Sequence, residues 1–518
     1  MEVNVKMKRI LAMILALAMV FSLAACGGNN TDATTPGANN PTSGNNSGDN
    51  TGNDEVYTVK FTLITLAVVP NLDAIQAVED EINRHLAESG ETRYVLDLSV
   101  MAIADYFTNI PMELAAGQGP DLVMMLDTMP TYVDNGYVIP LDPYMDNELK
   151  DTAELIGPIL NSGKINGSVY MIPRYYGTVL DWKFIYNNDL ANGVYDMSKV
   201  TDMESLEPAL AALKEAHPDE HFLVYSDQFH MIYSYETNTS QIGTYAATVG
   251  DSTTLVSYYE TDAYKQAIKT AYEWRQKGYL DPEGSTNTLT HDEAVFSGSS
   301  KGVIMGHSAP VDGIQEMFDE MNGYGADFEA VTIGFSDLYT DTVGVGVSYT
   351  SQRPDLAANF INHLYTDEYL WNTMIYGVEG QDYVWNEDHT VCSYPEGLDG
   401  TSIPYMFMMY SCGIIGNGFF YLPFEGNNSG NTPEYGMELM QDAWAPPLYG
   451  FTPSNANVLN EVAAVSNVVS QYNEVLTFGD VNPDEFYDQF IQELKNAGID
   501  TIIADYQAQA NAWLEANG

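Results

Sequence analysis

The chain has 518 residues, of which 45% are hydrophobic and 12% aromatic, so it has the material for a large core. Its 72 acidic residues against 19 basic ones give a formal net charge of −53. A field of that sign repels nucleic acid and disfavours strongly anionic ligands, which excludes nucleic-acid binding and leaves neutral or cationic solutes.

The first residues have the pattern of a targeting segment. Lys6, Lys8 and Arg9 precede an apolar run over residues 10–23, which has the length of a signal-peptide core. That run is shorter than the roughly 20 apolar residues that span a bilayer. It ends in Leu-Ala-Ala-Cys-Gly at residues 23–27, which resembles a lipobox. We therefore predict a signal peptide over residues 1–25 and lipidation of Cys26, whose acyl chains hold the protein on the outer face of the bacterial cytoplasmic membrane.

Residues 26–55 are expected to be a disordered tether. After Cys26 the segment has no aromatic, large aliphatic or basic residue up to residue 55. Such a sequence buries too little apolar surface to offset the entropy lost on ordering.

The body is predicted to be α/β. Strands are predicted at Tyr57–Val69, Tyr94–Met101 and Asp121–Leu126. Between them lie a helix capped by Asp73 and a second helix over Asp105–Ala116. This order indicates a mostly parallel sheet covered on both faces. Further helices are predicted at Met203–Lys214, Asp262–Lys277, Pro354–Tyr365, Pro483–Asn496 and Ile499–Glu515.

Metals and cofactors are not indicated. The chain has no CxxC pair, HExxH motif or Cys/His cluster of the kind that binds zinc. The acidic run Asp480–Asp488 lacks the alternating ligands of a calcium loop. Cys392 and Cys412 could form a disulfide or remain two buried thiols.

Several runs together resemble one protein family. They are LAAGQGPDLV at 114–123, NGYVIPL at 135–141, GKINGSVYMIP at 163–173, IYNNDL at 185–190, GVGVS at 344–348 and RPDLAANFI at 353–361. In this order they are similar to the extracellular solute-binding proteins related to maltose-binding protein. Two more runs, YGVEGQDY at 376–383 and GID at 498–500, resemble a branch of large lipoprotein receptors for carbohydrate import.

The resemblance implies a two-lobed periplasmic-binding-protein-like fold of type II, with the ligand cleft between the lobes. Lobe 1 is expected over 56–180 plus about 325–385, and lobe 2 over 181–324 plus about 386–518. The resemblance also implies a monomer whose lobes close on the solute by a hinge motion.

Sugar sites need aromatic platforms together with polar partners for hydroxyl groups. In the first lobe, Asn71 and Asp127 follow predicted strands at the cleft edge, although Asn71 could instead belong to an N-terminal turn and Asp127 could cap a helix. Tyr175 and Tyr176 follow the hairpin near the hinge, where only one of the two is expected to face the cleft. Trp182 on the crossing strand is a stacking candidate or a core residue.

The second lobe supplies five further candidates. Asp227 and Phe229 follow the predicted strand Phe222–Tyr225. The resemblance places His307 at a cleft position, while Asn417 and Trp444 lie in a region rich in glycine and aromatic residues.

The predicted function is that of a lipid-anchored, non-catalytic solute-binding protein. It would capture an oligosaccharide or other sugar and deliver it to the permease subunits of an ABC importer. A receptor for peptides or other organic solutes, and a signalling sensor with the same fold, remain alternatives. A glycoside hydrolase is disfavoured because nothing in the sequence marks a catalytic carboxylate pair.

Overall fold

The computed structural model describes residues 56–65, 69–126, 128–177, 179–180, 182–287, 300–306, 327–334, 337–338, 343–399, 402–405, 415–425 and 433–517. The predicted signal peptide and tether lie outside these residues. So do Cys26, Asp127, His307 and Cys412.

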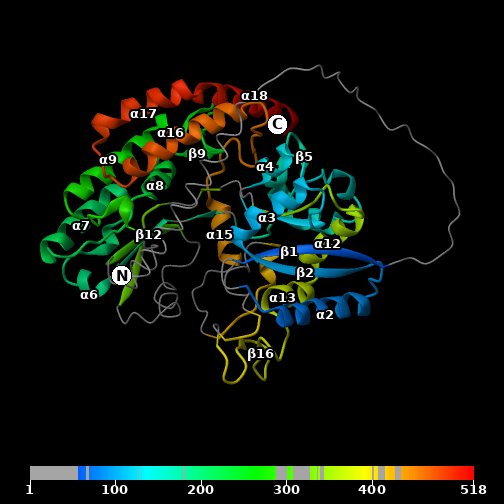
Figure 1. The fold of residues 1–518 in the computed structure, drawn as a ribbon. Helices are drawn as coiled ribbons and strands as arrows, with labels where there is room; N and C mark the ends of the chain where they lie inside the picture. The colour runs from blue at the N-terminus through cyan, green and yellow to red at the C-terminus, as the bar shows by residue number, and fades with distance from the viewer. Residues whose placement is uncertain are drawn as a thin grey trace, which may run out of the picture. The chain divides into compact units, whose positions relative to one another are not determined.

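The first lobe is built on a five-stranded sheet with the order β2-β1-β3-β15-β6 (Figure 1). Its strands are β1 (Tyr57–Thr65), β2 (Tyr94–Ala102), β3 (Leu122–Leu126), β15 (Val343–Val347) and β6 (Ile172–Pro173). The first three are parallel, as predicted, and β15 returns antiparallel to β3 from more than 200 residues later in the chain.

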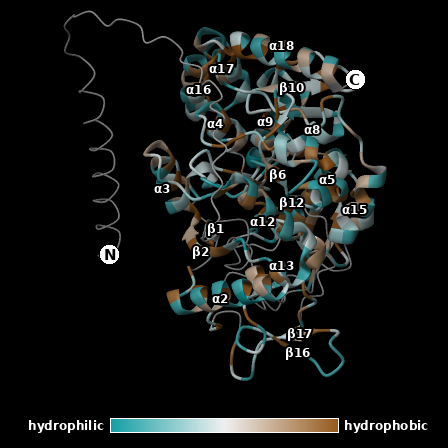
Figure 2. Cartoon of the chain, turned by 90° about the vertical axis from the view of Figure 1, so that its right-hand side faces the viewer, coloured by the Kyte–Doolittle hydropathy of each residue, from teal (hydrophilic) through white to brown (hydrophobic). Residues whose placement is uncertain are grey.

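Helices α2 (Leu72–Glu88), α3 (Ile103–Ala115), α12 (Pro354–Thr366) and α13 (Glu368–Tyr376) pack around this sheet. Hydrophilic and hydrophobic residues alternate along α2 (Figure 2), and its predicted apolar face is the buried one. The cap of α2 differs from the prediction. Asn71 accepts the Ala74 N–H at 2.9 Å, whereas Asp73 lies inside the first turn.

The Gly-Pro-Asp turn before β3 joins three parts of this lobe. Asp121 is 5% exposed, and its carboxylate accepts hydrogen bonds from the Tyr57 hydroxyl at 2.7 Å and the Lys60 N–H at 2.9 Å. The Ser351 hydroxyl donates to it as well, from the loop before α12. A side chain at Gly119 would overlap Leu114, so the turn allows helix α3 and strand β3 to approach closely.

The second lobe has a three-stranded antiparallel sheet with β8 (Trp182–Asn187) between β12 (Gly302–Gly306) and β13 (Phe328–Thr332). Helices α7 (Met203–Ala216), α8 (Phe229–Glu236) and α9 (Asp262–Gln276) belong to the same lobe. The strand predicted at Phe222–Tyr225 is wrong: only Leu223 pairs there, in a single bridge to Leu280. The buried side chains form one cluster around Phe184, Phe229 and Trp274.

A second cluster in this lobe joins a hairpin to the C-terminal helices. The hairpin strands β9 (Thr239–Ile242) and β10 (Ala246–Val249) pair antiparallel, and β11 (Val256–Ser257) pairs with β10. Their apolar side chains pack with α16 (Leu459–Thr477), α17 (Pro483–Ala497) and α18 (Ile499–Asn517). Within the described part of the chain, none of the helices combines the length and apolarity that crossing a bilayer requires.

All five helices predicted beyond residue 200 are confirmed, whereas α16 is not predicted by the sequence pattern. Helix α16 has no side-chain cap at its first residue and is rich in valine, so its local signals are weak. The shorter elements are α4 (Met129–Asp134), α5 (Lys150–Ile156), α6 (Asn188–Ala191), α15 (Pro433–Asp442), β4 (Lys164–Ile165), β5 (Ser168–Val169), β7 (Val179–Leu180), β14 (Asp337–Leu338), β16 (Val384–Trp385) and β17 (Cys392–Ser393).

Short 3-10 turns complete the described elements. They are η1 (Asp142–Tyr144), η2 (Gly157–Gly163), η3 (Met197–Lys199), η4 (Tyr258–Glu260), η5 (Gly284–Thr286) and η7 (Gly418–Phe420).

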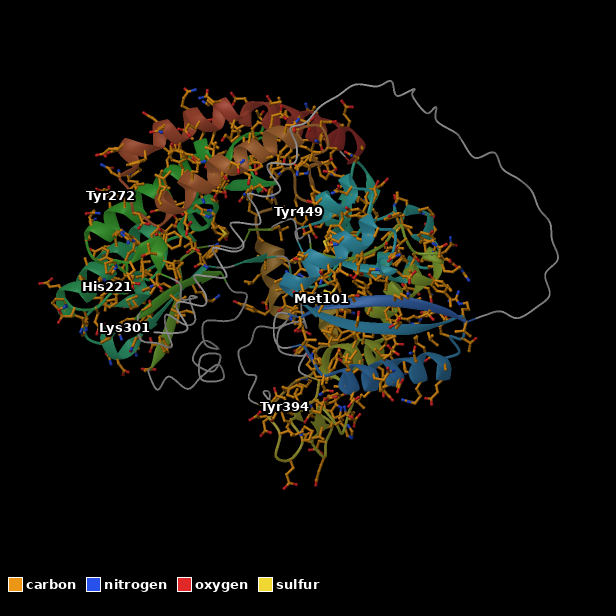
Figure 3. All side chains as sticks on the ribbon, in the orientation of Figure 1. Met101, His221, Tyr272, Lys301, Tyr394 and Tyr449 are labelled. Atoms are coloured by element: carbon orange, nitrogen blue, oxygen red, sulfur yellow. The ribbon has the colours of Figure 1, made fainter. Side chains whose placement is uncertain are left out.

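The core of the first lobe includes an extension around β16 and β17. Cys392, Tyr405 and Leu422 are buried in that core, and Tyr394 (Figure 3) packs on Phe424 with ring centroids 5.3 Å apart. The lobe boundaries expected from the sequence assign these residues to the second lobe, but their side chains pack with the first. Cys392 is a buried free thiol, and burial raises its pKa to about 12.

The lobes are joined by the short antiparallel pair of β7 and β14. Strand β7 carries the chain from β6 in the first lobe to β8 in the second, and β14 carries it back from β13 to β15. Beside this pair, Gly177 and Gly436 of α15 approach so closely that a side chain on Gly177 would overlap the backbone of Gly436. The close approach requires glycine at position 177.

Replacing Asp121 by alanine is expected to lower the free energy of unfolding by about 3 kcal/mol, because three donors lose a part-buried acceptor. Chemical denaturation measures the change. Asp97→Ala, on the exposed side of β2, is the matched control and should change stability by less than about 0.5 kcal/mol. Equal losses in both variants would contradict a special role for the Asp121 carboxylate.

Candidate functional site

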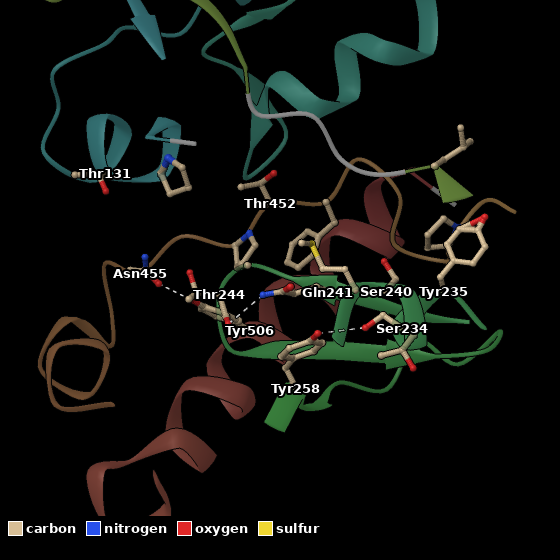
Figure 4. A pocket seen from close by; sticks show the side chains of 18 of the residues that line it. Thr131, Ser234, Tyr235, Ser240, Gln241, Thr244, Tyr258, Thr452, Asn455 and Tyr506 are labelled. Atoms are coloured by element: carbon tan, nitrogen blue, oxygen red, sulfur yellow. Dashed lines mark hydrogen bonds between the residues drawn. The ribbon is translucent and has the colours of Figure 1, made fainter. Parts of the chain in front are cut away.

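A pocket of about 540 Å³ lies between the lobes (Figure 4). Pro130 and Thr131 of α4 line it from the first lobe, while α8, the β9–β10 hairpin and Tyr506 of α18 line it from the second. Leu338 of β14 also lines the pocket, which places it at the joint between the lobes. The volume falls within the range of roughly 300–1,000 Å³ that is usual for small-molecule sites.

One side of the pocket consists of a buried hydroxyl network. The Tyr258 hydroxyl lies 2.6 Å from Nδ1 of His230. It also lies 3.2 Å from the Ser234 hydroxyl, a contact drawn in Figure 4. Ser234 donates in turn to the His230 carbonyl at 2.7 Å. Burial raises the pKa of Tyr258 to about 12 and lowers the pKa of His230 to about 4, although the nearby Asp227 opposes the second shift. At neutral pH the Tyr258 and His230 side chains are therefore both uncharged.

The opposite wall is the segment that leads into α16. Phe451, Thr452, Pro453 and Asn455 line the pocket, and the Tyr506 hydroxyl donates to the Asn455 side chain (Figure 4). These residues come from the C-terminal part of the chain, where the sequence pattern indicates no candidate beyond Trp444.

Asp134 holds this wall to the first lobe. Its carboxylate, at the end of α4, accepts hydrogen bonds from the Ser454 hydroxyl and from the Asn455 N–H at 3.0 Å. From the other side, Gln509 of α18 exchanges two hydrogen bonds of 2.8 Å with the Ser454 backbone. Residues 454–455 thus connect α4 of one lobe to α18 of the other.

The pocket combines aromatic surfaces with neutral polar groups. Trp182, Tyr235 and Phe451 supply apolar area, and Trp182 is 4% exposed at the start of β8. Hydroxyl and amide side chains surround them; these belong to Thr131, Ser240, Gln241, Thr244, Thr452 and Asn455. Such a surface can stack on an apolar ligand face and exchange hydrogen bonds with hydroxyl groups.

Two of the predicted residues lie at the pocket. Trp182 lines it directly. Trp444 is half-buried beside it, where its carbonyl accepts the N–H of the lining residue Leu338 at 3.0 Å.

Three others are brought together away from the pocket lining. Tyr175 exchanges backbone hydrogen bonds with the residues on either side of Asn417, and its ring lies 4.9 Å from that of Phe419. The side chain of Asn417 is 5% exposed and bonds the Tyr365 carbonyl at 3.1 Å. Next to them, the Arg174 guanidinium lies 5.7 Å from the ring of Tyr176. Tyr175 and Tyr176 are half-buried, whereas the side chain of Asn417 is hydrogen-bonded to the backbone.

The remaining described candidates lie elsewhere. Asn71 caps α2 and is not among the lining residues. Phe229 is fully buried, and its ring packs 5.2 Å from Trp274 in the core of the second lobe. Asp227 is half-buried and raises the pKa of His230, but it does not line the pocket either.

Most of the lining residues are not among those predicted from the sequence. On α8 the lining face begins at Met231, beyond the predicted candidates Asp227 and Phe229, and continues with Ser234 and Tyr235. Tyr506 belongs to the apolar stripe of α18, where helical spacing predicts a core position. The turn-rich run Thr452–Asn455, just before a helix, is the one local signal that could have indicated a functional loop.

The chain is similar to known solute-binding proteins. A family model of bacterial extracellular solute-binding proteins matches residues 97–370, and a domain of unknown function (DUF3502) matches residues 447–515. A carbohydrate ABC transporter substrate-binding protein of Streptococcus pneumoniae serotype 4 is 22% identical over 425 residues, which cover 81% of this chain and 84% of that protein.

Solved structures agree on the fold. The N-glycan transport solute-binding protein NgtS from Streptococcus pneumoniae superposes with a TM-score of 0.69 at 20% identity, covering 89% of this chain and 100% of that one. Its complex with Man1GlcNAc gives a TM-score of 0.66 at 21% identity, covering 88% and 99%. These similarities confirm the predicted type II fold.

The buried His230 should make stability depend on pH. Its pKa is about 4 in the folded chain against 6.5 ordinarily, so between these values the unfolded chain binds a proton that the folded chain does not. This difference lowers the free energy of unfolding as pH falls from 6.5 to 4, by up to about 1.4 kcal/mol per pH unit.

The variant His230→Gln removes this titration. Denaturation curves between pH 4 and 7 should therefore show a shallower loss of stability for the variant than for the unmodified protein. Parallel losses in the two proteins would contradict the assignment.

Proposed function

The chain belongs to the bacterial extracellular solute-binding proteins, and on that basis we propose that it captures an oligosaccharide in the pocket between its lobes for import by an ABC transporter. Proteins of this family bind solutes and are not enzymes. The proposal therefore assigns the pocket a binding role with no chemical step.

The observation that carries the proposal is the composition of the pocket. The aromatic side chains of Trp182, Tyr235 and Phe451 contribute to the lining, together with hydroxyl and amide groups. Sugars present apolar C–H faces and many hydroxyl groups, so both halves of this surface find a partner on a glycan. A purely apolar solute would leave the polar half of the pocket unsatisfied.

The relatives support the same ligand class. The pneumococcal relative is named as a carbohydrate transporter component, and NgtS has been solved with Man1GlcNAc. Both align with most of this chain at about one-fifth identity, which supports a glycan as the ligand class.

The location of the pocket suits capture by closure. Pro130 and Thr131 face it from one lobe, the hairpin faces it from the other, and β7 and β14 join the two beside Leu338. A ligand that touches both sides favours the conformation in which the sides are close. We propose that the permease subunits receive the solute from this closed form.

The proposed anchor is the lipidated Cys26. The lipobox-like sequence at residues 23–27 and the polar segment after it support an outward-facing protein tethered to the membrane. Tethering would keep the binding protein near its permease. Mass spectrometry of the protein purified from membranes tests for the acyl chains. The Cys26→Ser variant is expected to be released into the medium.

Direct binding tests the function. Residues 56–518 should be stabilised by a glycan from a library of oligosaccharides, because a ligand at a hundredfold excess over Kd adds about 2.7 kcal/mol to the free energy of unfolding. Short peptides, amino acids and polyamines form the comparison arms of the same thermal-shift screen. Stabilisation by peptides alone would indicate that the protein is a peptide receptor. Hydrolysis of the glycan would contradict a binding role.

Gln241 is the best single probe of the pocket. Its side chain is exposed on β9, where its amide donates to the Thr244 carbonyl at 3.2 Å. Gln241→Ala should weaken glycan binding roughly tenfold, about 1.4 kcal/mol, as expected for the loss of one hydrogen bond. Gln492→Ala, on the exposed face of α17, is the control and should leave Kd unchanged in calorimetry. An unchanged Kd for Gln241→Ala would remove the hairpin from the site.

A further inference from the structure

Resting on the proposed function, we propose that the ligand is an uncharged oligosaccharide, and that the pocket discriminates against glycans carrying carboxylate, sulfate or amine groups. This inference names the class of glycan, which neither the family nor the pocket volume defines.

The inference comes from the chemistry of the described lining residues. Among the described residues, 19 line the pocket, and none of them is Asp, Glu, Lys, Arg or His. Charged residues make up 18% of the whole chain, so their absence from the described part of the lining is not explained by overall composition. Every polar group on the described lining is a hydroxyl, an amide, the Trp182 indole N–H or the backbone.

Two carboxylates beside the wall at residues 454–455 already accept hydrogen bonds from the protein itself. Both oxygens of Asp134 accept hydrogen bonds from residues 454–455. Asp505, one turn before Gln509, accepts from Gln509 at 2.6 Å and from Asn457 at 3.1 Å. These acids shape the wall and are not among the residues that face the cavity.

A charged ligand group would lose its hydration in this pocket and find no ionic partner among the described lining residues. Removing a charge from water is costly unless an opposite charge or several good hydrogen bonds replace the water. For anions the net charge of −53 adds long-range repulsion. For amines that field is attractive, but no described lining residue offers the carboxylate that would pair with them. Neutral hydroxyl groups meet partners of their own kind and carry no such cost.

The test uses the neutral glycan that binds best in the screen and two series made from it. In one series each primary hydroxyl in turn is oxidised to a carboxylate, and in the other each is replaced by an amine. Calorimetry with the purified protein is expected to show that no charged derivative binds more tightly than the parent. At least one derivative in each series should bind roughly hundredfold more weakly.

A charged derivative that binds more tightly than its parent would overturn the inference while leaving the proposed function intact. The inference would also be overturned if every derivative in both series bound with the same affinity as the neutral parent. If no glycan binds at all, neutral or charged, the proposed function itself fails. The outcomes for the two proposals are therefore distinguishable.

A charge placed in the wall supplies an independent test. Gln241→Arg adds a guanidinium at the pocket, and it should improve the affinity for the carboxylate series relative to the neutral parent by roughly tenfold. Gln492→Arg adds the same charge on α17, outside the pocket. It should leave unchanged the ratio of the affinity for the carboxylate series to the affinity for the neutral parent. Equal ratios in the two variants would show that the pocket lining does not set the charge preference.

Discussion

The short pairing of β7 with β14 is the constraint on which the site depends. These two strands carry the chain between two lobes that bury their apolar residues in separate clusters. Because neither cluster extends through the joint, the space beside it is left for polar side chains. Trp182, which follows β7, and Leu338 of β14 are therefore part of the pocket lining as well as of the connection.

The C-terminal region forms one wall of the pocket. Residues 447–515, which match a domain of unknown function, supply Phe451, Thr452 and Asn455 to the pocket and Tyr506 behind them. Asp134 and Gln509 hold this wall from opposite lobes through residues 454–455. A change of angle between the lobes must therefore either move this wall or break the hydrogen bonds of Asp134, which couples the wall to the conformation of the whole site.

The charge of the whole chain differs from the charge of the described pocket lining. The chain carries a net charge of −53, whereas the described pocket lining is neutral. Burial keeps His230 uncharged and Tyr258 protonated at neutral pH, so the hydroxyl network beside the cavity does not change its charge under ordinary conditions. On the proposed function, the acidity of the rest of the chain would affect which solutes approach, and the lining would affect which of them bind.

The sequence by itself determined the class of protein and most of the first lobe. Its parallel strands and the buried face of α2 follow from local periodicity, and the order of the short motifs along the chain is enough to indicate the family. Local patterns are sufficient there because each of these elements is specified by residues within a few turns of one another.

Only the tertiary structure decided the site. Thr131, Gln241, Asn455 and Tyr506 are separated by up to hundreds of residues, and no periodicity links them. The same packing placed Phe229 in the core, although its position after a predicted strand suggested a cleft residue. A ligand site depends on which side chains remain exposed after the lobes have packed, and that is a property of the assembled fold rather than of any segment.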